Sequence, residues 1–192
     1  EVSIGMPTTV VVGSTTKETA KYVQKIFMND RFRVYTSPDI IGIELGGSIK
    51  NVIALAAGVC DGLGLGDNTK AALITRGVAM GGHMETFCGL SGIGDLIVTC
   101  TSTHSRNHNA GVLIGKGMSM DEAMKEVNQV VEGVYSAKAA YSLAKKYKVS
   151  MPIVEQINEV LFDGVSATDA IQALLTREEC HEYQGLVWED DK

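Results

Sequence analysis

The amino-acid sequence predicts a mainly helical protein that begins with a short β-α-β segment. Apolar residues recur with strand and helix periodicity in turn up to about residue 38, and with helical periodicity almost everywhere after residue 39. The 192 residues are 45% hydrophobic and 21% charged, which suffices for one sizeable core and part of another. We therefore expect two units, residues 1–38 and residues 39–192, with no internal repeat.

The first unit has the pattern of strand, helix and strand. Residues 8–12 form a β-branched run suited to a buried strand, and the hydroxyl residues 14–16 that follow are candidate helix caps. Residues 19–27 carry an apolar helical stripe, and residues 32–36 alternate as a short strand. This unit reads as a β-α-β segment cut from something larger.

Helices in the second unit are indicated first by capping signals. Ser119 with Glu122, and Ser166 with Asp169, match the capping-box pattern ahead of two apolar-periodic stretches. The second of these pairs predicts a helix over residues 170–175.

Two further helices have their own signals. Residues 134–147 show a face of alanines and a leucine at helical spacing. Pro152 suits the first turn of a helix that runs to Phe162, and Gly164 ends it. We therefore expect the second unit to be helical throughout.

Charge and hydropathy exclude some classes of partner. The formal net charge is −6, so neither nucleic acid nor an anionic membrane is the default partner, although a local basic pocket for a small anion is allowed. The longest apolar stretches, residues 40–43 and 52–59, are interrupted by Glu44, Lys50 and several glycines, and we expect neither to span a membrane. The sequence shows no signal-peptide pattern, and we expect a cytoplasmic protein.

Cysteines and histidines are widely and irregularly spaced. There is no CxxC pair and no histidine at metal-ligand spacing, so we expect reduced thiols that serve as small hydrophobes, and no metal site. Two of the histidines lie four residues apart, but no third ligand accompanies them. The residues concerned are Cys60, Cys88, Cys100, Cys180, His83, His104, His108 and His181.

Lys50 is the first candidate catalytic residue. It follows an almost uncharged run over residues 40–49, and an ammonium buried there without a partner is costly. A lysine amine held out of water can exchange a proton near neutral pH, as general acid-base catalysis requires. Gly46 and Gly47 lie one helical turn earlier, so a ligand or another backbone can approach that face. The structural alternative is that Lys50 extends to the surface and the glycines only allow close packing.

Asp95 is the second candidate. Gly89, Gly92 and Gly94 precede it, and an apolar helix over residues 96–98 follows. This pattern is not a dinucleotide phosphate cradle, because that motif needs a preceding strand and a third glycine further on, and a carboxylate would repel the phosphate. Asp95 is therefore either the N-cap of the helix or an acid that orients and neutralises a lysine.

Two short polar segments offer further candidates. Ser105, Arg106 and Asn107 present a hydroxyl, a planar guanidinium and an amide, which are donors suited to a phosphate group. Taken alone, such a tripeptide is usually a solvated loop. In the segment QVVEG, residues 129–133, Glu132 taken alone is no more than a surface residue before a helix.

Together these segments resemble a known family in order and spacing. ELGGSI followed by lysine and asparagine (residues 44–51), GIGDL (92–96), SRN and QVVEG resemble the C-terminal part of bacterial-type NAD(P)-dependent glycerol-3-phosphate dehydrogenase, and the resemblance covers essentially the whole chain. It implies that residues 39–192 form an all-helical substrate-binding domain like the C-terminal domain of 6-phosphogluconate dehydrogenase. Residues 1–38 would be the end of an NAD(P)-binding Rossmann domain.

The resemblance also implies a role for each candidate residue. Lys50 would accept the proton of the substrate hydroxyl, and Asp95 would hold Lys50 in place. The implied substrate-binding residues are Lys50, Asn51, Asp95, Thr99, Ser105, Arg106 and Asn107. The implied cofactor-binding residues are Arg106, Val130 and Glu132, and no metal is expected.

The implied reaction is reversible hydride transfer between sn-glycerol 3-phosphate and dihydroxyacetone phosphate with NAD or NADP, which supplies glycerol 3-phosphate for phospholipid synthesis. The expected partner is a small phosphorylated substrate, and a homodimer is allowed.

The sequence departs from the family in two ways. No GxGxxG follows a strand, so we expect this chain to be inactive alone, and the family carries several more residues after Gly77, which indicates an internal deletion or a loop closed up in the numbering.

Two alternative functions stay open. A β-hydroxyacid dehydrogenase also places a lysine and an asparagine on a glycine-containing helix, but there the asparagine lies about one turn after the lysine, whereas Asn51 is adjacent to Lys50. The other alternative is a helical dimerisation or ligand-binding module without catalysis.

Overall fold

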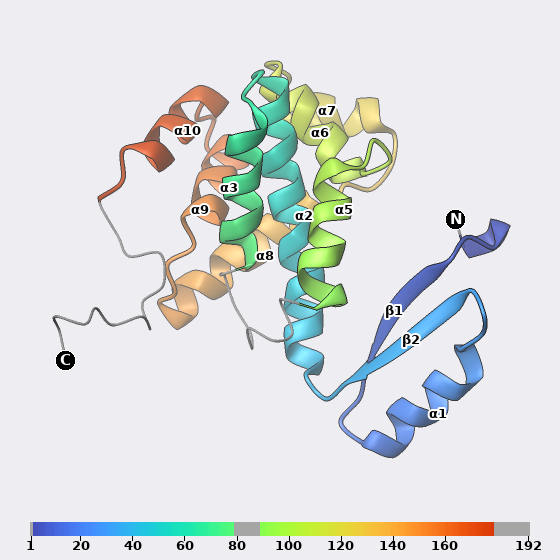
Figure 1. Ribbon diagram of the computed structural model, residues 1–192. Helices are drawn as coiled ribbons and strands as arrows, with labels where there is room; N and C mark the ends of the chain where they lie inside the picture. Colours follow the sequence, from blue (N-terminus) through green and yellow to red (C-terminus); the bar gives the residue numbers. More distant parts are fainter. Residues whose placement is uncertain (1, 79–88, 179–192) are drawn as a thin grey trace, which may run out of the picture.

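The chain starts with a parallel β-α-β unit, as predicted. The computed structural model describes residues 2–78 and 89–178. Its first elements are a 3-10 turn (Val2–Ile4), β1 (Thr8–Gly13), α1 (Lys17–Phe27) and β2 (Phe32–Ser37). The two strands pair in parallel and α1 packs beside them (Figure 1). Thr16 caps α1 by accepting the backbone N–H of Thr19, so a cap stands where the hydroxyl run predicted one.

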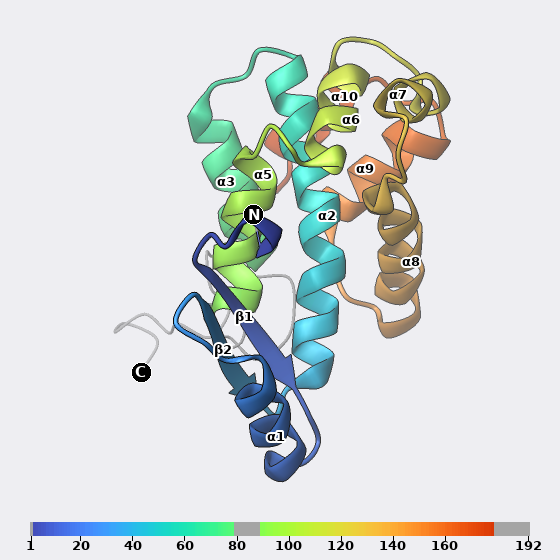
Figure 2. The same cartoon turned by 90° about the vertical axis from the view of Figure 1, so that its right-hand side faces the viewer.

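The described part of the chain after Asp39 is helical, which confirms the predicted fold class. The helices are α2 (Ile40–Gly62), α3 (Asp67–Val78), α5 (Asp95–Thr101), α6 (Arg106–Gly115), α7 (Met120–Val127), α8 (Glu132–Tyr147), α9 (Pro152–Phe162) and α10 (Ala167–Leu175), with a single π-helical turn (Leu90–Gly94) before α5. Asp39 caps α2 by accepting the N–H of Gly42 at 2.8 Å. Figures 1 and 2 show α2 running through the centre, with α3, α5, α6, α8 and α9 packed around it.

α2 is longer than its sequence pattern suggested. The apolar stretches 40–43 and 52–59 belong to one helix of 23 residues, whose most apolar window has a mean hydropathy of 1.5. By length and composition alone this helix could cross a membrane, so its apolar stretch is longer than the sequence pattern indicated. However, 56% of that window is buried inside the fold, and Val52, Ile53 and Leu55 are fully buried. α2 is therefore placed as the core helix of the helical unit.

α2 and α6 touch through their backbones. Gly58 and Gly62 on α2 face Gly111 and Gly115 on α6, and a Cβ built on Gly111 would lie 2.1 Å from the carbonyl oxygen of Leu55. Side chains at these four positions would force the helices apart, because backbone atoms cannot move aside as a flexible side chain can. This close crossing holds α6 against the C-terminal part of α2, with the backbone of His108 in the first turn of α6 next to Gly58.

The predicted capping signals are only partly reproduced. Ser119 and Glu122 form a complete capping box at the start of α7. Ser166 caps α10 by accepting the N–H of Asp169, but the Asp169 carboxylate accepts from the Ser166 hydroxyl rather than from its backbone. Glu122 accepts from both the hydroxyl and the backbone N–H of Ser119, whereas aspartate, one methylene shorter, reaches only the hydroxyl. Both α8 and α10 begin a few residues earlier than their apolar patterns indicated.

The described cysteines behave as predicted. Cys60 and Cys100 are buried free thiols, and burial raises the pKa of Cys60 to about 11 and that of Cys100 to about 12. Such thiols are inert small hydrophobes. The expectations for Cys88, Cys180, His83 and His181 fall outside the described residues.

Candidate active site

Lys50 and Asp95 form an ion pair between two helices. Lys50 lies in the middle of α2, and its Nζ donates to Oδ2 of Asp95, the first residue of α5. Gly94 is the N-cap of α5 and Asp95 does not cap it through its side chain, so the interpretation of Asp95 as a helix cap is wrong. The Lys50 side chain is 24% exposed, so it is not closed off from solvent.

Thr99 fixes the carboxylate that holds Lys50. Its hydroxyl lies one turn after Asp95 on α5 and is 2.6 Å from the Asp95 backbone oxygen and 3.3 Å from Oδ1. One carboxylate oxygen therefore contacts Thr99 and the other contacts Lys50. Because both carboxylate oxygens have a partner, the orientation of the Asp95 side chain toward the Lys50 amine is fixed.

Asn51 begins a second polar chain, which joins α2 to α6 and α8. Asn107 donates to Oδ1 of Asn51 at 2.9 Å, and Asn51 in turn donates to Oε2 of Glu132 at 3.2 Å. Oδ1 of Asn107 accepts the backbone N–H of Gly133 at 2.8 Å. Asn51 and Asn107 are each 7% exposed, so both amides are buried and most of their hydrogen bonds must come from the protein. These bonds fix the orientation of both amides.

Arg106 is the exposed cation of the site. Its side chain is 44% exposed, and its guanidinium lies 3.7 Å from Oε1 of Glu132, which makes a weak ion pair. Ser105 caps α6 by accepting the N–H of His108, and its hydroxyl hydrogen remains available to a ligand. Val130 is 60% exposed in the segment that leads into α8.

Open space lies on both sides of these residues. Gly47 is one helical turn before Lys50 and Asn51 on the same face of α2, and no described atom lies within 4 Å of a Cβ built on it. A cavity of about 530 Å³ opens beside Arg106 and is also lined by His104 and Gln129. A ligand can therefore approach both the amine and the guanidinium.

The arrangement suits acid-base chemistry on an anionic substrate. One amine, held by a carboxylate, can accept or return a proton, and a guanidinium lies at the edge of the same site. Among residues 2–78 and 89–178, no group of three or more histidine, cysteine or acidic side chains could hold a metal ion. Of the residues that the resemblance implied for the cofactor, Arg106 and Val130 are exposed and Glu132 is bonded to Asn51.

Two features of the site were not predicted from the sequence. Glu132 reaches Asn51 across 81 positions of the chain, and a second cluster joins Asp61, Lys70 and His108. The only sequence signal for that cluster is one acid at the end of the apolar run that forms α2. The shortened segment after Gly77 lies at residues 79–88, outside the described part of the chain.

Sequence comparison identifies the family. A model of the NAD-dependent glycerol-3-phosphate dehydrogenase C-terminus matches residues 39–172. A relative in Agathobacter rectalis named glycerol-3-phosphate dehydrogenase (NAD(P)+) is 61% identical over 196 aligned positions, which cover 98% of this chain and 58% of the relative. A protein of the same name in Fusobacterium nucleatum is 60% identical, with 96% of this chain and 58% of that protein covered.

Solved structures agree with this assignment. The crystal structure of glycerol-3-phosphate dehydrogenase from Coxiella burnetii superposes with a TM-score of 0.88 at 40% identity, over 92% of this chain and 57% of that one. The yeast enzyme, at 22% identity and a TM-score of 0.80, shares the fold. This chain thus spans somewhat more than half the length of the curated relatives that it matches. The chain belongs to the NAD-dependent glycerol-3-phosphate dehydrogenase family, and it contains the C-terminal domain of that family.

Proposed function

We propose that the protein containing this chain interconverts sn-glycerol 3-phosphate and dihydroxyacetone phosphate with NAD(P)+ and NAD(P)H. The observation that carries this proposal is the partly exposed Lys50 side chain, held by Asp95 and followed by Asn51, which Glu132 links to the cation Arg106. The names of the relatives, glycerol-3-phosphate dehydrogenase (NAD(P)+), support the same reaction.

Lys50 is the proposed proton acceptor. Oxidation of the C2 hydroxyl removes a hydride from carbon and a proton from oxygen, and a nicotinamide cofactor, when bound, supplies the hydride acceptor. The Lys50 amine takes the proton, and the Asp95 carboxylate stabilises the ammonium that forms. In the reverse direction the ammonium donates the proton and stabilises the charge that develops on the carbonyl oxygen. Thr99 keeps Asp95 in the orientation that both steps require.

Arg106, Ser105 and Asn107 are the proposed phosphate-binding residues. A phosphate dianion attracts a guanidinium more strongly than the single carboxylate of Glu132, so Arg106 can turn from its loose partner to the substrate. Asn107 uses one N–H for Asn51, which leaves the second amide hydrogen for a ligand. In the same proposal, Arg106, Val130 and Glu132 face the cofactor.

Domain organisation and cellular role follow from the same proposal. Residues 1–38 are the proposed end of the NAD(P)-binding domain and residues 39–192 the substrate domain, which is supported by a family model that starts at residue 39. We propose that the complete enzyme acts in the cytoplasm, as a possible homodimer, and supplies glycerol 3-phosphate for phospholipid synthesis. The two buried, reduced cysteines are compatible with that compartment.

The first prediction concerns the phosphate-binding role of Arg106. In the complete enzyme, Arg106→Ala is expected to raise KM for glycerol 3-phosphate about 30-fold, because a charge-assisted hydrogen bond contributes roughly 2 kcal/mol. Thermal stability should hardly change, since the side chain is 44% exposed and its pair with Glu132 is loose. Initial rates and melting curves measure the two effects.

The control for Arg106 is Lys116→Ala, which removes an exposed cation from the other end of α6. It should leave KM unchanged. The proposal fails if the parent enzyme oxidises unphosphorylated glycerol as well as glycerol 3-phosphate, because the site would then not recognise phosphate.

A second prediction uses the space above Gly47. Gly47→Ala should stabilise the fold by up to about 1 kcal/mol, because alanine is the better helix former and the methyl group meets no described atom. The same methyl group is expected to lower kcat/KM several-fold, since it occupies room beside Lys50 that the ligand needs. Chemical denaturation and steady-state kinetics on one preparation test both signs. Unchanged kinetics in a stabilised variant would show that no ligand uses this space.

A further inference from the structure

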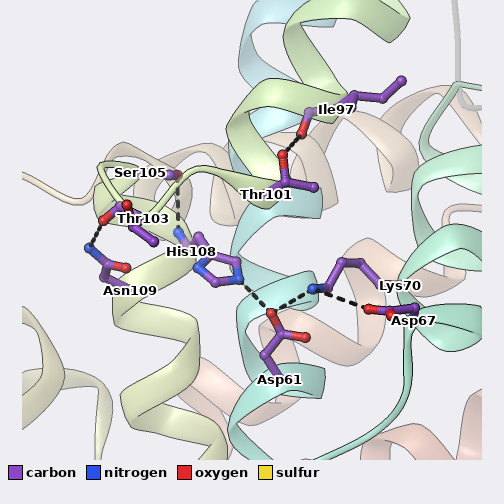
Figure 3. Close-up of polar contacts among 9 residues, drawn as sticks. All are labelled: Asp61, Asp67, Lys70, Ile97, Thr101, Thr103, Ser105, His108 and Asn109. Carbon is purple, nitrogen blue, oxygen red and sulfur yellow. Dashed lines mark hydrogen bonds and ion pairs between the residues drawn. The ribbon is translucent and has the colours of Figure 1, made fainter.

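A second polar cluster lies outside the proposed reaction site. Oδ2 of Asp61, near the end of α2, is 2.8 Å from Nε2 of His108 on α6 and 2.8 Å from Nζ of Lys70 on α3 (Figure 3). The side chains of Asp61, His108 and Lys70 are 26%, 12% and 18% exposed, so each is partly shielded from water. None of them takes part in the proton transfer or phosphate binding described above.

The hydrogen bond from His108 to Asp61 has a fixed direction. Burial acts to raise the pKa of Asp61, but hydrogen bonds from Lys70 and His108 hold it below its ordinary value, so the carboxylate is ionised and can only accept. Nε2 of His108 therefore carries the proton. Nδ1 is buried and has no hydrogen-bond partner among the described residues.

A buried imidazole nitrogen without a hydrogen bond lowers the stability of the fold. An apolar side chain of similar size would leave no buried polar atom unsatisfied. What the imidazole provides, and an apolar group does not, is one directed bond to the carboxylate on α2. The position of His108 in the chain indicates what that bond is for.

His108 belongs to the first turn of α6, directly after Arg106 and Asn107. Its backbone N–H bonds to Oγ of Ser105 at 3.2 Å, and the neighbouring Asn109 donates to the backbone oxygen of Thr103 at 2.9 Å (Figure 3). These two bonds shape the turn itself. The side-chain bond to Asp61 ties the turn to α2, the helix that carries Lys50 and Asn51.

The first turn of α6 is thus attached to α2 at two levels. The bond from Asn107 to Asn51 holds it near the middle of α2, and the bond from His108 to Asp61 holds it three turns further along. The glycine crossing already holds the two helices against each other, and these two side-chain bonds, one on either side of Gly58, set how the first turn of α6 is oriented on α2. Since Arg106 lies in this turn, its distance from Lys50 depends on both.

We propose that His108 is a positioning residue, whose bond to Asp61 orients the first turn of α6 so that Arg106 and Asn107 meet the phosphate while Lys50 meets the hydroxyl. The inference rests on the proposed function. Lys70 binds the same carboxylate from α3 and has no contact with α6 in the cluster, so it supports Asp61 without orienting the turn. That difference provides a matched control.

The test compares variants of the complete enzyme. His108→Leu removes the bond and keeps an apolar volume, and His108→Gln places an amide N–H near the position of Nε2. His108→Asn places its amide near Nδ1, too short to reach Asp61. Lys70→Met removes the other partner of Asp61. Each variant is assayed for kcat, for KM of glycerol 3-phosphate, for competitive inhibition by inorganic phosphate, and for its melting temperature.

His108→Leu is expected to raise KM and the phosphate inhibition constant about tenfold, with kcat changed less than about threefold. His108→Gln should recover most of both losses. Lys70→Met should lower the melting temperature while KM stays as in the parent. If His108→Leu does not fold, the comparison of His108→Asn with His108→Gln tests the inference. His108→Asn should raise KM because its amide cannot reach Asp61, whereas His108→Gln should not.

Three results would overturn the inference. His108→Leu with a parental KM would show that the bond does not position the donors. Lys70→Met with an equal rise in KM would show that loss of stability alone causes it. A parent enzyme that turns over no glycerol 3-phosphate would overturn the proposed function, and the inference with it, whereas the first two results leave the proposed function intact.

Discussion

Lys50→Ala in the complete enzyme is expected to lower kcat by about 10³-fold or more. The amine is proposed both to accept the proton and to stabilise the developing charge, and general acid-base catalysis alone contributes roughly 10²- to 10⁴-fold. Folding should be nearly unaffected. Asp95 is 40% exposed, so water can solvate its carboxylate once the lysine is gone, and a partly exposed ion pair contributes at most about 1 kcal/mol.

Lys50→Arg separates the two roles of the amine. Arginine keeps the positive charge beside Asp95 but does not give up its proton at neutral pH. If Lys50 acts only through its charge, the arginine variant should keep most of its activity; if it accepts the proton, both variants should be almost inactive. The change in nicotinamide absorbance measures turnover, and a melting curve checks the fold. Alanine at position 50 with parental turnover would refute the assignment of Lys50 as proton acceptor.

Local signals were predicted well because their causes lie within a few residues. The capping box at Ser119 and Glu122, the proline in the first turn of α9 and the left-handed Gly164 after α9 are each set by neighbours in the sequence. The strands of the first unit were found for the same reason, the first from its β-branched run and the second from its alternating pattern.

Contacts across the chain explain what the sequence did not show. Lys50 seemed isolated in an apolar run because its partner, Asp95, comes 45 residues later. The hydrogen bonds between Asn51 and Asn107 and between Asp61 and His108 could not be predicted for the same reason, since each joins residues far apart in the sequence. The candidate residues were grouped by resemblance to a family, and spacing alone would not have brought α2, α5 and α6 together.

The length of α2 was underestimated for a related reason. Glu44, Lys50 and the glycines were counted as interruptions of an apolar stretch. In a helix that other helices surround, such residues can be accommodated by a charged partner, by open space or by a neighbouring backbone. Lys50 points to a carboxylate, Gly47 to open space, and Gly58 to the backbone of α6. A glycine in the sequence does not reveal which of these surroundings it will have.

Gly111→Ala is expected to be the most destabilising of the single-methyl substitutions considered. The added Cβ would lie 2.1 Å from the carbonyl oxygen of Leu55 and 2.9 Å from the backbone nitrogen of Val59. Both are main-chain atoms of the core helix, so α6 must move away from α2 to make room. Overpacking of a core costs roughly 1–3 kcal/mol and occasionally more, and a backbone clash belongs at the upper end of that range.

Gly47→Ala is the matched control for Gly111→Ala, because both add one methyl group to a helical glycine. Alanine favours the helix by about 1 kcal/mol at each site, yet only position 111 places the methyl group against backbone. We expect the two variants to change the free energy of unfolding with opposite signs. Equal stability of the two would show that α2 and α6 do not cross as closely as described. Since Arg106 and Asn107 begin α6, the same displacement should weaken phosphate binding in any Gly111→Ala protein that still folds.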